Sequence, residues 1–177
     1  MKITYYWTYN KLEFLGGANL KGIILKEGQE FFTDMKIVFD SIKNEQLKYN
    51  WLITDLELNE DIPILTDKNP CFISGEELTK IINETKDIQW IWGVLSAFPK
   101  DIPVDKILKY PLPYTDEYKG FWQNPISLQH PLAVIEIVPF DSSLTLLISK
   151  DDKIIDDFKN SCPLSEDLEE YNKQFIN

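Results

Sequence analysis

The segment from Ile88 to Phe98 is apolar at both sets of alternating positions. Its side chains divide into Ile88, Trp90, Trp92 and Val94 on one face and Ile91, Gly93 and Leu95 on the other. A strand with one solvated face would alternate between apolar and polar residues, whereas a strand buried on both faces is apolar throughout. The pattern therefore predicts a strand in the centre of a sheet.

Strand-like and helix-like patterns are interspersed along the rest of the chain. We expect strands at 1–8, before Gly16-Gly17, and at 22–25, 49–53, 132–138 and 144–148. Helical spacing of apolar residues covers 31–42, and Ser74 with Glu77 has the form of a capping box. Further helices are expected at 104–108, after Asp151 and around Leu168. Because strict alternation of strand and helix is absent, we predict one α+β domain over residues 1–177, with one mixed or antiparallel sheet and about four helices.

A long connection from Pro99 to Pro131 is rich in proline and aromatic residues. Prolines exclude long helices and central strands, and the aromatic residues are Tyr110, Tyr114, Tyr118, Phe121 and Trp122. Such a connection either packs as an irregular layer or serves as a recognition surface. We favour packing, because a structureless segment of this length needs apolar anchors of its own.

The charge balance restricts the classes of partner. The chain has 29 Asp and Glu against 18 basic residues, all of them Lys, and its net charge is -11. Binding of DNA or RNA depends on clustered cations, and Arg supplies the bidentate contacts that Lys replaces poorly. We expect no nucleic acid as ligand. The negative surface either maintains solubility or attracts a basic protein partner.

Targeting and redox features indicate a cytoplasmic protein. Polar residues interrupt the first ten positions, so no apolar leader is expected, and no apolar run approaches the length of a membrane span. Cys71 and Cys162 lie far apart and belong to no metal-binding or CxxC spacing, which favours reduced thiols. We expect no membrane association.

Residues with catalytic potential are few. The single histidine, His130, excludes most metal sites, and a nucleophilic pair with Cys71 or Cys162 would need adjacency in space. We favour a solvent-facing loop position for this histidine. Glu136 interrupts an apolar strand pattern, where burial would raise its pKa. We favour the interpretation that Glu136 lies at an edge or solvent-facing strand position or pairs with a lysine. No nucleotide-binding, hydrolase or zinc-protease motif is present. We therefore predict no cofactor, no metal and no catalytic residue.

Two segments are strongly acidic. Residues 55–67 hold five carboxylates and no lysine, and residues 151–177 hold eight carboxylates against three lysines. Such surfaces steer cationic partners. The residues that we predict to bind a partner are Asp55, Glu57, Glu60, Asp61 and Trp122.

In overall type, the chain resembles the acidic immunity proteins of bacterial toxin systems. This resemblance implies a non-enzymatic protein that binds a basic toxin and covers its active site. The alternatives are a module that binds a small molecule or peptide through Trp90, Trp92, Tyr114 or Trp122, and a hydrolase built on Glu136 and His130 with a cysteine or aspartate.

A local resemblance concerns short stretches of the chain. Residues 49–51, 73–78, 96–99 and 148–151 are similar to a family of uncharacterised small proteins from low-GC Gram-positive bacteria. The matching stretches lie on predicted structural elements, whereas the segment 110–131 departs from the family. The resemblance implies no activity and assigns no functional residue.

Overall fold

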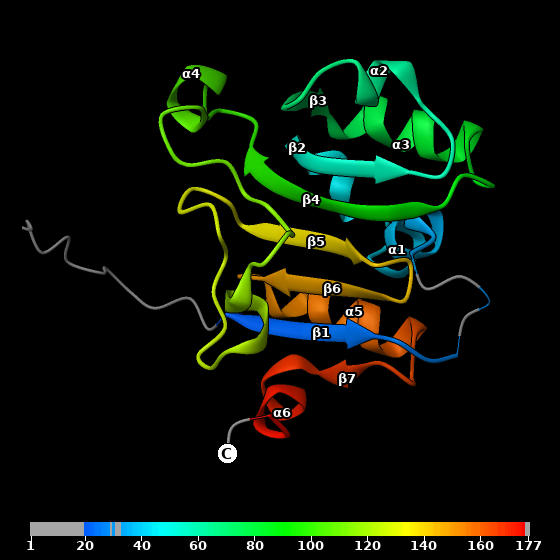
Figure 1. The fold of residues 1–177 in the computed structure, drawn as a ribbon, viewed down its shortest axis with the longest axis vertical. Coiled ribbons are helices and arrows are strands. Elements are labelled where there is room, and N and C mark those ends of the chain that lie inside the picture. Colours follow the sequence, from blue (N-terminus) through cyan, green and yellow to red (C-terminus); the bar gives the residue numbers. More distant parts are fainter. Residues whose placement is uncertain (1–19, 29, 31–32, 176–177) are drawn as a thin grey trace, which may run out of the picture.

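A seven-stranded antiparallel sheet forms the centre of the protein (Figure 1). The computed structural model describes residues 20–28, 30 and 33–175, so the strands predicted before Gly16-Gly17 lie outside the described residues. The strand order is β3-β2-β4-β5-β6-β1-β7. The strands are β1 (Lys21–Leu25), β2 (Tyr49–Leu58), β3 (Cys71–Ser74), β4 (Trp90–Pro99), β5 (Ile135–Phe140), β6 (Leu144–Ser149) and β7 (Glu166–Asp167). The central position predicted for 88–98 is confirmed, since β4 pairs with β2 and β5.

Six α-helices and two 3-10 turns connect the strands in the described residues. The helices are α1 (Met35–Ser41), α2 (Pro63–Thr66), α3 (Gly75–Glu84), α4 (Val104–Ile107), α5 (Asp152–Ser161) and α6 (Leu168–Lys173), and the 3-10 turns are η1 (Glu45–Lys48) and η2 (Lys119–Trp122). The predicted α+β class with one sheet is confirmed, and the sheet is antiparallel. The expected number of about four helices is inexact, because two of the six, α2 and α4, are single turns. Helix α2 has Pro63 at its first position, where the fixed φ of proline suits a helix, and α4 follows Pro103, its N-cap residue.

The helix starts follow the predicted capping chemistry. Ser74 Oγ accepts a hydrogen bond from the Glu77 backbone N at 3.1 Å, and Asp151 Oδ1 accepts from the Lys153 backbone N at 2.9 Å. Each oxygen satisfies an amide that has no partner inside its helix. The serine cap predicted for α3, which is one half of the capping box, and the aspartate cap of α5 are therefore confirmed.

Helices α1, α3 and α5 cover one face of the sheet, here called the helix-covered face (Figure 1). Alternate residues of neighbouring strands point into this layer, among them Ile53, Leu95 and Ile137. The Trp51 indole N donates to the backbone carbonyl of Gln46 at 3.1 Å, so its polar atom has a partner although the ring is buried.

The proline-rich connection and α6 cover the opposite face, here called the loop-covered face. In Figure 1 the connection leaves α4 and passes diagonally across the front of the sheet to η2. Its anchors are the buried side chains of Ile107, Phe121 and Ile126. Burying a side chain of the size of Phe or Ile contributes roughly 1.5–3 kcal/mol. The predicted irregular packing layer is confirmed for these residues.

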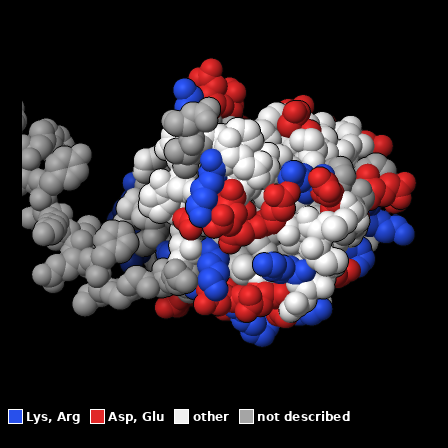
Figure 2. All heavy atoms as spheres, turned by 90° about the horizontal axis from the view of Figure 1, so that it is seen from below, with Lys and Arg blue, Asp and Glu red and all other residues white. Residues whose placement is uncertain are grey.

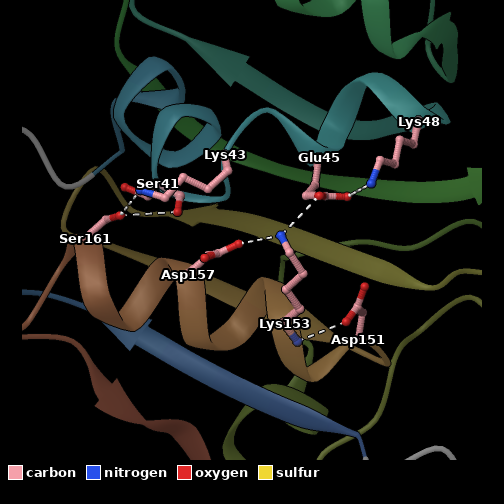
Figure 3. A network of polar contacts seen from close by, with 8 residues as sticks. All are labelled: Ser41, Lys43, Glu45, Lys48, Asp151, Lys153, Asp157 and Ser161. Atoms are coloured by element: carbon pink, nitrogen blue, oxygen red, sulfur yellow. Dashed lines mark hydrogen bonds and ion pairs between the residues drawn. The ribbon is translucent and has the colours of Figure 1, made fainter.

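A polar network joins α5 to η1 on the surface (Figure 3). The Lys153 ammonium lies 3.2 Å from the Glu45 carboxylate and 2.7 Å from the Asp157 carboxylate, and Glu45 also pairs with Lys48 at 2.5 Å. Hydrogen bonding to Lys48 lowers the pKa of Glu45 despite its partial burial, and Lys153 adds to this effect. The network fixes α5 against the turn that leads into β2.

Candidate functional site

A hollow of about 500 Å³ lies where β2 and β4 meet the proline-rich connection. We call it the acidic hollow. Its lining residues are Asp55, Leu56, Glu57, Asn69, Trp92, Thr115 and Asp116. They come from β2, from the segment before β3, from β4 and from the connection, so the hollow exists only when these four parts are assembled.

An irregularity in β2 shapes the acidic hollow. Asp55 has φ 53°, in the left-handed region that Asp tolerates better than most residues, and the pairing of β2 with β4 shifts between Thr54 and Glu57. Bulges of this kind bend a strand and re-aim its side chains. Glu57 consequently lies opposite Trp92 in the ladder, and both side chains line the hollow.

A second irregularity in the pairing of β2 with β4 separates the two central tryptophans. Trp90 is buried with the helix-covered cluster, whereas Trp92 contacts Phe140 and lines the acidic hollow. The prediction that both rings lie on one face is therefore wrong. Strict alternation ends at the second register shift, between Glu57 and Leu58, which faces these two tryptophans.

The Asp55 carboxylate holds the connection in place. It accepts hydrogen bonds from the Thr115 backbone N at 2.6 Å and from the Thr115 hydroxyl. Burial raises the pKa of Asp55, but these bonds and one from the Asp116 amide outweigh it, so that the pKa lies below its ordinary value. Asp55 is thus an ionised carboxylate that positions Thr115 and Asp116 at the rim.

A row of three rings borders the acidic hollow, and we call it the aromatic row. The Trp92 and Phe140 ring centroids are 4.5 Å apart, and those of Phe140 and Trp122 are 5.3 Å apart, both in edge-to-face geometry. A second hollow of about 310 Å³ lies beside the row, lined by Thr115, Glu117, Tyr118, Lys119, Trp122 and Phe140. Thr115 lines both hollows, which are therefore neighbours.

The chemistry of this region suits a cationic group. Three carboxylates and an indole line the acidic hollow, and both attract ammonium and guanidinium groups, the indole through its negative ring face.

Among the described residues, no group of three or more His, Cys, Asp or Glu side chains has an arrangement that would hold a metal ion. No helix in that same part of the chain has the length and apolar character needed to cross a bilayer.

The predicted partner-binding residues occupy different places. Asp55, Glu57 and Trp122 lie at the two neighbouring hollows, Asp55 and Glu57 in the acidic hollow and Trp122 at the second. Glu60 and Asp61 are exposed in the loop between β2 and α2 and line neither hollow. The acidic segment 55–67 therefore divides between two environments instead of lining one hollow.

The acidic residues after position 150 are interspersed with lysines. Figure 2, which views the molecule from the end that carries β7 and α6, shows red and blue side chains side by side. Glu166 pairs with Lys26 at 2.9 Å, and Glu170 pairs with Lys173 at 2.5 Å. This region has less uncompensated negative charge than its composition indicates.

Glu136 lies in the interior of the sheet, on β5, and is fully buried. The prediction of an edge or solvent-facing position is wrong, because the connection covers this part of the sheet. Backbone N–H groups of Gln129 and His130 donate to the carboxylate at 2.8 and 2.9 Å, and the Ser96 hydroxyl donates at 3.3 Å. Burial raises the pKa of Glu136 to about 7 against the opposing effect of these bonds and of the Lys150 charge.

His130 is buried and both ring nitrogens are engaged with the backbone. The Leu132 N–H donates to Nδ1 at 3.2 Å, so Nε2 carries the proton and donates to the Ile107 carbonyl at 3.1 Å. The prediction of a solvent-facing loop histidine is wrong. Burial lowers the pKa of His130, and the bond to Ile107 offsets this only in part.

The constellation expected for a hydrolase is not assembled. The Glu136 carboxylate meets the His130 backbone and not its ring. Cys71 and Cys162 are both buried with the helix-covered cluster, on the other side of the sheet from the His130 ring and its neighbour Phe98. Neither cysteine forms a nucleophilic pair with the histidine in this arrangement.

Sequence reasoning overlooked two contributors to the acidic hollow, Asp116 and Asn69. Their only signal is a polar residue beside proline-rich turns, which is common in loops.

No protein-family model, curated protein or solved structure matches this chain.

Proposed function

We propose that this protein is a non-enzymatic binding protein that recognises a basic protein partner through the acidic hollow and the aromatic row. The observation that carries the proposal is the junction of three carboxylates with Trp92 in one hollow of about 500 Å³. A lysine or arginine side chain of a partner would be attracted there by the carboxylates and could pack against the face of the indole ring. The net charge of -11 favours the approach of such a partner.

The interior residues support a binding role over a catalytic one. His130 and Glu136 have the chemistry for acid–base catalysis, but both are fully buried and bonded to backbone groups of the connection. Their bonds hold the layer that forms the rim of the acidic hollow. We therefore assign them to structure and propose that they have no part in a reaction.

Within this class, neutralisation of a toxin is the role that we propose. An immunity protein acts by occupying a toxin's surface, which requires a preformed, charged and aromatic contact region and no catalytic group of its own. The acidic hollow and the aromatic row have this composition. A toxin that acts on nucleic acid would present the basic surface that such a region complements.

The test compares two variants of equal charge. Glu57→Lys with Asp116→Lys changes the acidic hollow, and Glu60→Lys with Asp61→Lys makes the same change in net charge outside it. The immobilised wild-type protein is exposed to native cell lysate at low and high salt. We expect a stoichiometric basic protein that the first variant fails to retain and the second still binds.

The captured protein is then expressed alone and together with each variant. Growth arrest that the wild-type protein and the control variant relieve, but the hollow variant does not, would support neutralisation. Equal loss of binding in both variants would show that only net charge matters. Capture of no basic protein at either salt concentration would overturn the proposal.

A small cationic ligand is a second candidate, because the hollow has the volume of a small-molecule site. Thermal-shift measurements with a series of amines and guanidines separate the two candidates. Stabilisation by one compound that is lost in Glu57→Lys with Asp116→Lys would favour the small ligand. Stabilisation that depends only on ionic strength would not favour the small ligand.

A further inference from the structure

Four exposed apolar side chains form a stripe along the proline-rich connection. Leu108, Tyr110, Leu112 and Tyr114 are exposed to 47%, 38%, 41% and 49%. They occupy alternate positions of the segment 108–114, in which the intervening Lys109 and Pro111 are exposed as well and Pro113 is buried. A segment lying on a protein surface normally turns its apolar residues inward, so this outward set is unusual for a surface that contacts only water. We call these four residues the apolar stripe.

The backbone beneath the apolar stripe is held at both ends. At one end Ile107 is buried and its carbonyl accepts from His130 Nε2 at 3.1 Å. At the other end the Gln129 side chain bonds both the N–H and the carbonyl of Tyr114, at 3.0 and 2.9 Å. The Tyr110 ring also lies against the His130 ring, with centroids 5.3 Å apart. The stripe is therefore preorganised, which reduces the entropy lost when a partner binds.

The apolar stripe runs into the acidic hollow. Thr115 and Asp116, which follow Tyr114 directly, line the hollow, and the Tyr114 ring lies 5.3 Å from the Tyr118 ring at the second hollow. Along the chain, Lys106 precedes the stripe, Lys109 lies between its first two residues, and Asp116 and Glu117 follow its end. A partner would place its cations at the Tyr114 end and apolar side chains along the remainder.

We propose that the apolar stripe and the acidic hollow form one docking surface for a segment of the basic partner that carries cationic residues at one end and apolar residues along the remainder. This inference rests on the proposed function and adds the chemistry of the recognised segment. A second copy of this chain is the less suitable occupant, because two molecules of net charge -11 repel each other. Desolvated apolar and aromatic contacts supply most of the affinity, while the hollow selects charge.

Two labelled peptides of equal charge serve as probes, one in which lysines are followed by leucines and the other in which lysines are followed by serines. Their affinities for the full-length protein are measured by fluorescence anisotropy at several salt concentrations. We expect the wild-type protein to bind the leucine peptide at least about tenfold more tightly, the scale of a single hot-spot contact.

The decisive variant is Leu112→Asp, and its matched control is Ile64→Asp. Ile64 is exposed to 44% and lies on α2, outside both hollows, so the two substitutions remove similar exposed apolar groups and add the same negative charge. An added carboxylate would by itself strengthen the attraction for a cationic peptide. Loss of the preference for leucine in Leu112→Asp, with the preference intact in Ile64→Asp, would therefore report apolar contact at the stripe.

The outcomes separate the two proposals. If Leu112→Asp retains the full preference, or if the wild-type protein shows none, the stripe is not part of the docking surface. If Glu57→Lys with Asp116→Lys binds the serine peptide as well as the wild-type protein does, the acidic hollow does not recognise cations and the proposed function fails. Leu108→Asp is a second stripe variant, because its side chain is also exposed and its replacement leaves the core intact.

Discussion

Replacement of Glu136 by glutamine is expected to remove a specific pH dependence of stability. The carboxylate is fully buried, and burial raises its pKa to about 7 from the ordinary value of 4.5. Below pH 4.5 the residue is protonated in both the folded and the unfolded protein and contributes no pH dependence. As the pH rises from 4.5 to about 7, the unfolded chain releases this proton while the folded protein retains it, so stability falls.

The magnitude follows from the two pKa values. At about 1.4 kcal/mol for each pH unit, the interval from 4.5 to about 7 corresponds to a loss of about 3 kcal/mol in the free energy of unfolding. Above pH 7 the carboxylate is ionised in both states and the loss remains constant. Glutamine has no proton to release, so Glu136→Gln is expected to lack this decline.

Glutamine also changes the hydrogen bonding of the site. Its amide nitrogen replaces one carboxylate oxygen, and the Gln129 or His130 N–H then meets a donor instead of an acceptor. This lost bond costs about 1–3 kcal/mol at every pH. The variant should therefore be less stable than the wild-type protein at pH 5 and should approach or exceed its stability at pH 8.

Urea unfolding followed by tryptophan fluorescence between pH 4.5 and 8 measures both effects. The difference in the free energy of unfolding between the variant and the wild-type protein isolates the contribution of Glu136 from that of other titrating groups. Glu60→Gln, at an exposed position, serves as control. A difference that does not vary with pH would refute the assignment of a raised pKa to Glu136.

Three further substitutions, one of them with a matched control, test other parts of the structure. Asp55→Ala removes both bonds to Thr115 and should cost about 1–3 kcal/mol in urea unfolding, whereas an unchanged midpoint would argue against its role as an anchor. Gly75→Ala would place a Cβ 2.1 Å from a backbone oxygen of η1 and should destabilise the fold by about 3 kcal/mol, while Gly93→Ala, with no contact under 3.4 Å, should be far milder in the same thermal-unfolding series. Lys153→Met breaks the exposed network on α5 and should lower the urea midpoint only slightly, with a smaller effect at high salt.

The regular elements follow from local patterns, and the candidate site does not. The strand at 22–25, the serine cap of α3 and the aspartate cap of α5 depend on neighbours within a few residues, and the structure confirms all three. The acidic hollow depends on the shift in β2 at Asp55, which brings segments distant in sequence together. No local sequence pattern predicts that these distant segments come into contact.

Glu136 illustrates a second reason why sequence reasoning fails. A carboxylate in a strand is more often at a solvent-facing position, so its residue type favoured that interpretation. Its true partners are backbone N–H groups at positions 129 and 130. Backbone donors are the same for almost every residue type, so the sequence carries no sign of them.

The place of β1 in the sheet has a consequence for synthesis on the ribosome. This strand lies between β6 and β7, so its partners, Leu144–Ser149 and Glu166–Asp167, are translated long after it. At about 5–20 residues per second, the delay is on the order of ten seconds. During that interval Ile23, Ile24 and Leu25, all buried in the finished fold, have no strand beside them. The nascent chain therefore exposes an apolar strand that chaperones can bind, and completion of the sheet must await the C-terminal third of the chain.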